Sequence, residues 1–128
     1  MIKTSVIIGA SGTAITVVTN KNIAIALGSG DLPVFSTPSM IALMEEASAK
    51  VLKEFLEDTA ASVGIMVNIE HLAASGLGAK ITATARVESV DGRKIVFSVT
   101  AKDEKQEIGK GSHVRFIVDK EKFINKLS

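Results

Sequence analysis

Two carboxylates stand next to each other at Glu45 and Glu46, in a segment with helical periodicity. At about 100° per residue, Glu46 shares a face with Lys50 and Lys53, which predicts a solvated, ion-paired position. Glu45 falls instead on the apolar side of the same helix, beside Ile41. A carboxylate there costs free energy unless it is paired or has chemical work to do. Glu45 is therefore a candidate catalytic group, and the alternative is an edge position from which it reaches water.

The chain has two histidines, and His71 is the stronger candidate for proton transfer. It ends a run of alternating apolar residues and precedes a loop of small residues, so it is either a general base at the rim of a cleft or a hydrogen-bonded core residue. His113 has the opposite strand parity to Val114, Phe116 and Val118. That parity predicts that His113 points away from the core.

A third candidate, Thr37, stands where the helix is expected to begin. A threonine followed by proline, here Pro38, matches a helix N-cap with proline at the first helical position. Capping alone explains the pair. A helix start also presents free N–H groups and the positive end of the dipole, which suit an acyl oxygen or a developing oxyanion, so capping and catalysis are compatible.

The elements that position these groups follow from the apolar spacing. A helix is predicted from Thr37 to about Glu57, with an apolar arc wide enough for burial along most of its length. Strand patterns cover about Ser5 to Thr19, Val63 to His71, Ile81 to Glu88, Ile95 to Ala101 and Val114 to Val118. Asp91-Gly92 predicts a hairpin turn, and Gly28 to Pro33 a loop. The pattern predicts an α+β fold in which a curled five-stranded antiparallel sheet wraps one long central helix, and the hotdog fold is one option of that kind.

Length and composition narrow the class of protein. The 128 residues are expected to form a single domain over 1–128. Fifteen basic and fourteen acidic residues, scattered along the chain, give no footprint for nucleic acid. The apolar runs are too short for a membrane span or a secretory signal, so a cytoplasmic location is expected. The absence of cysteine excludes disulfides, a thiol nucleophile and cysteine-based zinc sites, and no motif indicates a metal.

Three segments together resemble the fluoroacetyl-CoA thioesterase-like branch of the hotdog superfamily. They are Val34 to Ala47 (VFSTPSMIALMEEA), Ile69 to Gly76 (IEHLAASG) and Ile108 to Val118 (IGKGSHVRFIV), in the family's order and spacing. The resemblance implies a hotdog homodimer, sometimes paired further, with active sites at the subunit interface. It implies catalytic roles for Thr37, Glu45 and His71, and places Gly64 and Arg115 near the bound thioester. The lid of the fluoroacetyl-specific enzyme is aromatic, whereas the matching loop here, residues 28–33, is not.

The sequence therefore predicts an acyl-CoA thioesterase acting on a small or medium acyl group, with CoA as part of the substrate and no other cofactor. His71 would activate water or relay a proton, while Glu45 would act as nucleophile or base and Thr37 would orient Glu45 or the acyl carbonyl. Attack by Glu45 and attack by water both remain open. The alternatives are a non-catalytic acyl-CoA-binding protein and a hotdog hydratase or dehydratase.

Overall fold

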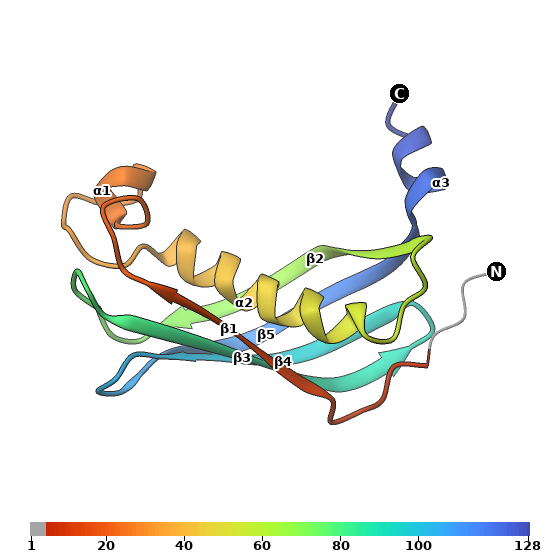
Figure 1. Ribbon diagram of the computed structural model, residues 1–128, viewed down its shortest axis with the longest axis horizontal. Coiled ribbons are helices and arrows are strands. Elements are labelled where there is room, and N and C mark those ends of the chain that lie inside the picture. Colours follow the sequence, from red (N-terminus) through yellow and green to blue (C-terminus); the bar gives the residue numbers. More distant parts are fainter. Residues whose placement is uncertain (1–4) are drawn as a thin grey trace.

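A long helix, α2, lies across one face of a curled five-stranded sheet (Figure 1). The computed structural model describes residues 5–128. The helices are α1 (Ala24–Leu27), α2 (Thr37–Lys53) and α3 (Lys120–Asn125). The strands are β1 (Ser11–Val17), β2 (Ala60–His71), β3 (Lys80–Asp91), β4 (Lys94–Lys102) and β5 (Glu107–Asp119).

Every pairing in the sheet is antiparallel, in the order β1-β3-β4-β5-β2. The predicted α+β class, with one long helix on an antiparallel sheet, is confirmed. Because β1 and β2 occupy the two edges, each leaves one side of its backbone without a strand neighbour. The α3 helix extends away from the sheet at the end opposite α1 (Figure 1).

The core lies between α2 and the central strands. Alternate residues of β3 and β4 are buried against the helix, as the period of two predicted. They are Ile81, Ala83, Ala85 and Val87 on β3, and Ile95, Phe97, Val99 and Ala101 on β4. The helix contributes Met40, Leu43, Met44, Ala47, Val51 and Leu52. The predicted hairpin at Asp91-Gly92 is also present, with Gly92 at φ +60°.

The start of α2 differs from the prediction by one residue. Ser36, not Thr37, is the N-cap, and its hydroxyl accepts a hydrogen bond from the Ser39 N–H at 3.2 Å. Thr37 is thus the first helical residue, and its side chain is not needed for capping. The helix ends at Lys53 rather than near Glu57, and β1 begins at Ser11 because a turn with Gly9 at φ +92° precedes it.

The face predicted for β2 was wrong in part. A register shift between Gly64 and Met66 interrupts the alternation, so that Ile65 and Val67 are about half exposed instead of buried in the core of this chain. The strand therefore presents an apolar surface at the open edge of the sheet.

The predicted orientation of His113 was also wrong. His113 pairs with Phe97 and Arg115 pairs with Ile95, and both β4 partners are fully buried beneath α2. Cross-strand partners point to the same face of a sheet, so His113 and Arg115 face the helix, and Phe116 faces outward. His113 is only 1% exposed.

Candidate active site

The start of α2 and the end of β2 bring two of the predicted residues together. Thr37 Oγ1 lies 2.7 Å from His71 Nδ1, a hydrogen bond between residues far apart in the sequence. The Ser36 cap turns the chain into the helix and leaves the Thr37 hydroxyl free to meet the imidazole. Thr37 itself is exposed, so the pair lies where a ligand can reach it.

His71 combines partial burial with an unsatisfied nitrogen. Its Nε2 is the one buried side-chain polar atom without a hydrogen-bond partner among residues 5–128. Leaving such an atom unpaired costs on the order of 1–3 kcal/mol, which a bound ligand, water or second subunit would relieve. Burial lowers the pKa of His71 below its usual 6.5, and this effect outweighs that of the nearby Ala73 backbone, which acts to raise the pKa. The imidazole is therefore neutral near pH 7 and able to accept a proton.

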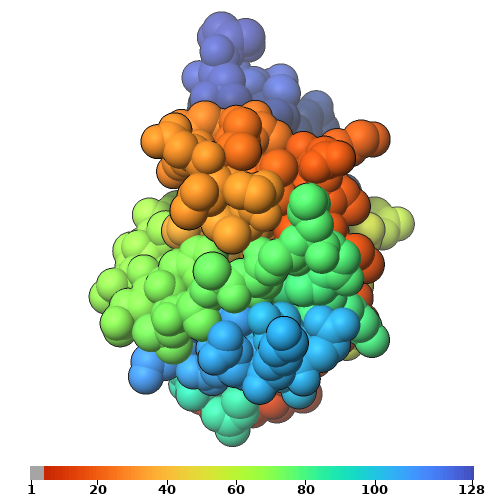
Figure 2. All heavy atoms as spheres, turned by 90° about the vertical axis from the view of Figure 1, so that its left-hand side faces the viewer, coloured from red at the N-terminus to blue at the C-terminus, as the bar shows by residue number. Residues whose placement is uncertain are grey.

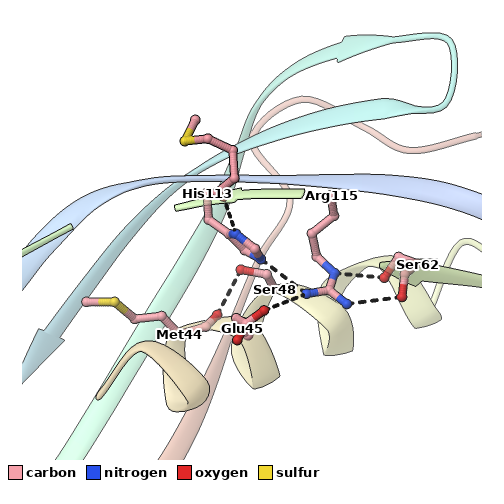
Figure 3. A network of polar contacts seen from close by, with 7 residues as sticks. Met44, Glu45, Ser48, Ser62, His113 and Arg115 are labelled. Atoms are coloured by element: carbon pink, nitrogen blue, oxygen red, sulfur yellow. Dashed lines mark hydrogen bonds and ion pairs between the residues drawn. The ribbon is translucent and has the colours of Figure 1, made fainter. Parts of the chain in front are cut away.

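A second polar group forms around Arg115, whose side chain is 10% exposed (Figure 3). Its Nε donates to Ser62 Oγ at 2.8 Å and its Nη2 donates to the Ser62 carbonyl at 3.1 Å. Its Nη1 lies 3.7 Å from Glu45 Oε2 on α2. Burial lowers the pKa of Arg115 and the charge of Glu45 opposes that shift. A guanidinium stays protonated in proteins, so Arg115 is a fixed cation beside Glu45.

Glu45 lies between a buried cation and solvent. It has a buried cationic partner in Arg115, and its side chain is still 42% exposed. The carboxylate therefore lies against Arg115 on one side and is open to solvent on the other.

Gly64 makes room for this arrangement. A Cβ atom at Gly64 would lie 2.8 Å from Glu45 Oε2 and 3.0 Å from His113 Cε1. It would also lie 3.4 Å from Arg115 Nη1. A side chain at position 64 would therefore push the Glu45 carboxylate from its present place and press on the His113 ring.

Within one chain, the Thr37–His71 pair and the polar residues around Arg115 lie apart from each other. Thr37 and Glu45 lie roughly two turns apart on α2, about 12 Å along its axis. The structure therefore joins Thr37 to His71, and Glu45 to Gly64 and Arg115, but it does not gather all five predicted residues around one point of a single chain.

A pocket of about 450 Å³ opens beside Thr37 and His71. Its other walls are the loop between α1 and α2 and the residues that follow β2, including Leu72 to Ala74. Figure 2 shows these two segments, orange and green, meeting at one end of the molecule. No group of three or more His, Cys, Asp or Glu side chains suited to a metal ion occurs between residues 5 and 128. No helix in that range is long and apolar enough to cross a membrane.

Comparison of the sequence with known proteins shows the family to which the chain belongs. Residues 18–121 match the family described as FlK, fluoroacetyl-CoA-specific thioesterase. The fluoroacetyl-CoA thioesterase of Streptantibioticus cattleyicolor is 38% identical over 94 residues, which cover 73% of this chain and 68% of that protein. This chain belongs to the fluoroacetyl-CoA-specific thioesterase family.

Solved structures agree with that membership. A crystal structure of an FlK variant has a TM-score of 0.90 and 32% identity, covering 98% of this chain and 97% of that one. A thioesterase superfamily member from Thermus thermophilus has a TM-score of 0.88 and 28% identity, covering 95% and 90%. The predicted hotdog fold, the predicted family and the prediction of a thioester hydrolase are confirmed.

Sequence reasoning missed two members of the Arg115 group. Ser62 carried no signal, because its role depends on pairing between β2 and β5. His113 carried one, since it stands two residues before Arg115 and thus on the same strand face. Two polar residues on one face of a strand could have indicated a buried polar network in this thioesterase.

Proposed function

We propose that this enzyme hydrolyses a small or medium acyl-CoA to the free acid and CoA. The observation that carries the proposal is the Thr37 to His71 hydrogen bond beside a pocket, with His71 Nε2 buried and unpaired. Relatives support the substrate class, since another FlK variant, 31% identical over 94% of this chain with a TM-score of 0.89, was crystallised with acetyl-CoA. The loop at residues 28–33 has no aromatic residue, so we do not assign fluoroacetyl-CoA as the acyl donor.

In the proposed reaction, water adds to the thioester carbonyl carbon and the C–S bond breaks. Neutral His71 accepts the proton from water and relays it to Glu45, which acts as the final base, while Thr37 orients the imidazole or the acyl carbonyl. The thiolate of CoA leaves and takes up a proton, and the acid is released. In the alternative route Glu45 attacks the carbonyl itself and forms an anhydride that water, activated by His71, then cleaves.

The helix start supplies a candidate oxyanion donor. The N–H groups of Ser39 and Met40 are already bonded to Ser36, and Pro38 has no N–H. The Thr37 N–H has no hydrogen-bond acceptor among residues 5–128. It lies at the N-terminus of α2, the positive end of the helix dipole, where a developing oxyanion is stabilised.

We further propose a homodimer, able to pair again into a dimer of dimers, in which each active site draws on both subunits. The edge strand β2 exposes Ile65, Met66 and Val67, at 55%, 42% and 44%. Antiparallel pairing of two β2 strands would bury that surface and run the His71 end of one strand along the Ala60 end of the other. The Thr37 and His71 pair of one subunit then approaches the Glu45 and Arg115 group of its partner. A cytoplasmic location fits the cysteine-free composition.

The first test is thiol release from a panel of short, branched and aromatic acyl-CoAs. We expect turnover with at least one short or branched acyl group, because the pocket beside Thr37 is of limited volume. A protein that binds acyl-CoA and releases no thiol across the panel would instead be a non-catalytic binding protein. Hydration of an enoyl-CoA without thiol release would indicate a hydratase.

The shared site predicts complementation between two inactive variants. Subunits carrying Glu45→Gln and His71→Ala are co-expressed with different affinity tags, and the heterodimer is purified. One of its two sites then keeps both groups, so we expect about half of the wild-type activity per dimer.

Light scattering on the wild type supplies the control, with a dimer expected at micromolar concentration. A heterodimer as inactive as its two parents would place the complete site within one chain. A stable monomer with full activity would show that the active site needs no subunit interface.

A further inference from the structure

His113 lies at the centre of the Arg115 group, yet none of the steps proposed above uses it (Figure 3). It is 1% exposed and projects from β5 toward α2. Its ring stacks on Phe97 of β4, with centroids 6.4 Å apart and planes inclined by 27°. A fully buried histidine that is hydrogen-bonded to the guanidinium beside Glu45 is a candidate for a role beyond packing.

The two hydrogen bonds of His113 fix its tautomer. Nδ1 lies 2.8 Å from the Met66 carbonyl oxygen, which can only accept, so Nδ1 must carry the proton. Nε2 lies 3.1 Å from Arg115 Nη1, which can only donate, so Nε2 must be unprotonated. His113 is thus the neutral Nδ1–H form, and it links the backbone of β2 to the guanidinium.

We infer that His113 is a positioning residue for thioester hydrolysis, which holds Nη1 of Arg115 toward Glu45. The inference rests on the proposed role of Glu45. Ser62 fixes Nε and Nη2, and His113 accepts one N–H of Nη1, so the guanidinium is held in a single orientation with Nη1 3.7 Å from Glu45 Oε2. With the guanidinium held at three nitrogens, the carboxylate meets a cation of fixed orientation.

The arrangement depends on His113 remaining neutral. The charged groups that face it are Arg115 on its own strand and Glu45 on α2, and the Met66 carbonyl faces it from β2. A proton on Nε2 would point at the guanidinium N–H groups and break the contact with Arg115. Burial lowers the pKa of His113, the Met66 hydrogen bond raises it, and the charge of Arg115 lowers it again. The charge of Glu45 raises it in turn, and the net effect is a lowered pKa that keeps the ring neutral.

Replacing His113 with asparagine or with glutamine tests its two hydrogen bonds one at a time. The amide nitrogen of asparagine lies near the Nδ1 position, so His113→Asn keeps a donor for Met66 and loses the acceptor for Arg115. The amide oxygen of glutamine reaches the Nε2 position, so His113→Gln keeps the acceptor and loses the bond to Met66. We expect kcat for His113→Asn to fall by up to about 100-fold, the scale of a misplaced catalytic group, with KM much less affected. His113→Gln is expected to retain most of the wild-type kcat.

A merely structural histidine gives the opposite order. If tying β5 to β2 were its only task, His113→Asn would keep full turnover, and His113→Gln would lose melting temperature and activity together. That result would overturn the inference. Equal turnover in wild type and a folded His113→Asn would do so as well.

The tautomer provides a readout that depends neither on activity nor on whether the His113 variants fold. The chain has two histidines, so long-range ¹H–¹⁵N spectra of the wild type show two imidazoles, and His71→Ala identifies which signals belong to His113. We expect His113 at neutral pH as the Nδ1–H form with an unprotonated Nε2. An Nε2–H form or an imidazolium would refute the inference even in an active thioesterase. The expected tautomer in a wild type that releases no thiol would leave the contact intact and refute the proposed function instead.

Discussion

Replacing His71 with alanine is expected to lower thiol release by roughly 10²–10⁴-fold, the usual contribution of a general base. The imidazole is hydrogen-bonded to Thr37, its Nε2 is unpaired, and the pocket opens beside it. Substitution removes the proton acceptor, while the cap at Ser36 and the ladder between β2 and β5 remain. The measurement is kcat for the best acyl-CoA of the panel, made on protein shown to be folded and dimeric.

Glu70→Ala is the matched control for this substitution. Glu70 precedes His71 on β2 and is exposed, so its loss disturbs the same end of the strand without touching the pair. We expect near-normal turnover for it. His113→Ala cannot serve as a control, because His113 is buried and bonded to Arg115. A folded His71→Ala dimer with near-normal activity would show that His71 is only a packed residue.

The pH dependence of the wild type follows from the lowered pKa of His71. A base is active when unprotonated, so activity is full above the folded-state pKa and falls below it, with an inflection under the usual 6.5. Stability moves in the same direction. The unfolded chain takes up the proton at higher pH than the native one, so the free energy of unfolding decreases as pH falls below about 6.5. Rates at acidic pH therefore need a parallel measurement of the folded fraction.

Glu45→Gln is expected to reduce turnover by a comparable factor of about 10²-fold or more, whereas Glu46→Gln leaves it unchanged. The pair is closely matched, since the two residues are neighbours on α2 and the same atoms change. Glu45 faces Arg115 and Gly64, and Glu46 is exposed. The amide is nearly isosteric with the carboxylate but can act neither as base nor as nucleophile. Equal activity in both variants would remove Glu45 from the catalytic set.

Isotope incorporation separates the two routes open to Glu45. The experiment is a single turnover in H₂¹⁸O. If Glu45 attacks the thioester, water then cleaves the anhydride, and attack of that water at the Glu45 carboxyl carbon leaves one ¹⁸O atom in the Glu45 side chain. Direct attack by water places the label only in the released acid. Label in the Glu45 carboxylate is therefore the diagnostic result, because only the anhydride route can place it there.

Local periodicity was sufficient for most of the fold. The alternation from Ile81 to Val87 and the turn at Asp91-Gly92 involve neighbours in the sequence, so they were visible without any tertiary contact. The helical wheel likewise separated Glu45 from Glu46, because both belong to one element. The helix start was predicted one residue late, since a serine and a threonine at Ser36 and Thr37 are both good caps and only the hydrogen bond to Ser39 distinguishes them.

The sequence by itself determined the α+β class, the long helix, the hairpin and the residue types available for thioester chemistry. Only the tertiary structure decided which face of β5 is the inner one. Val114, Phe116 and Val118 looked like the core face, but pairing with Ile95 and Phe97 turned His113 and Arg115 inward. Strand parity gives two faces and does not say which is covered. That choice depends on register against a neighbouring strand, which is a non-local contact, and it is the choice that created the polar group around Glu45.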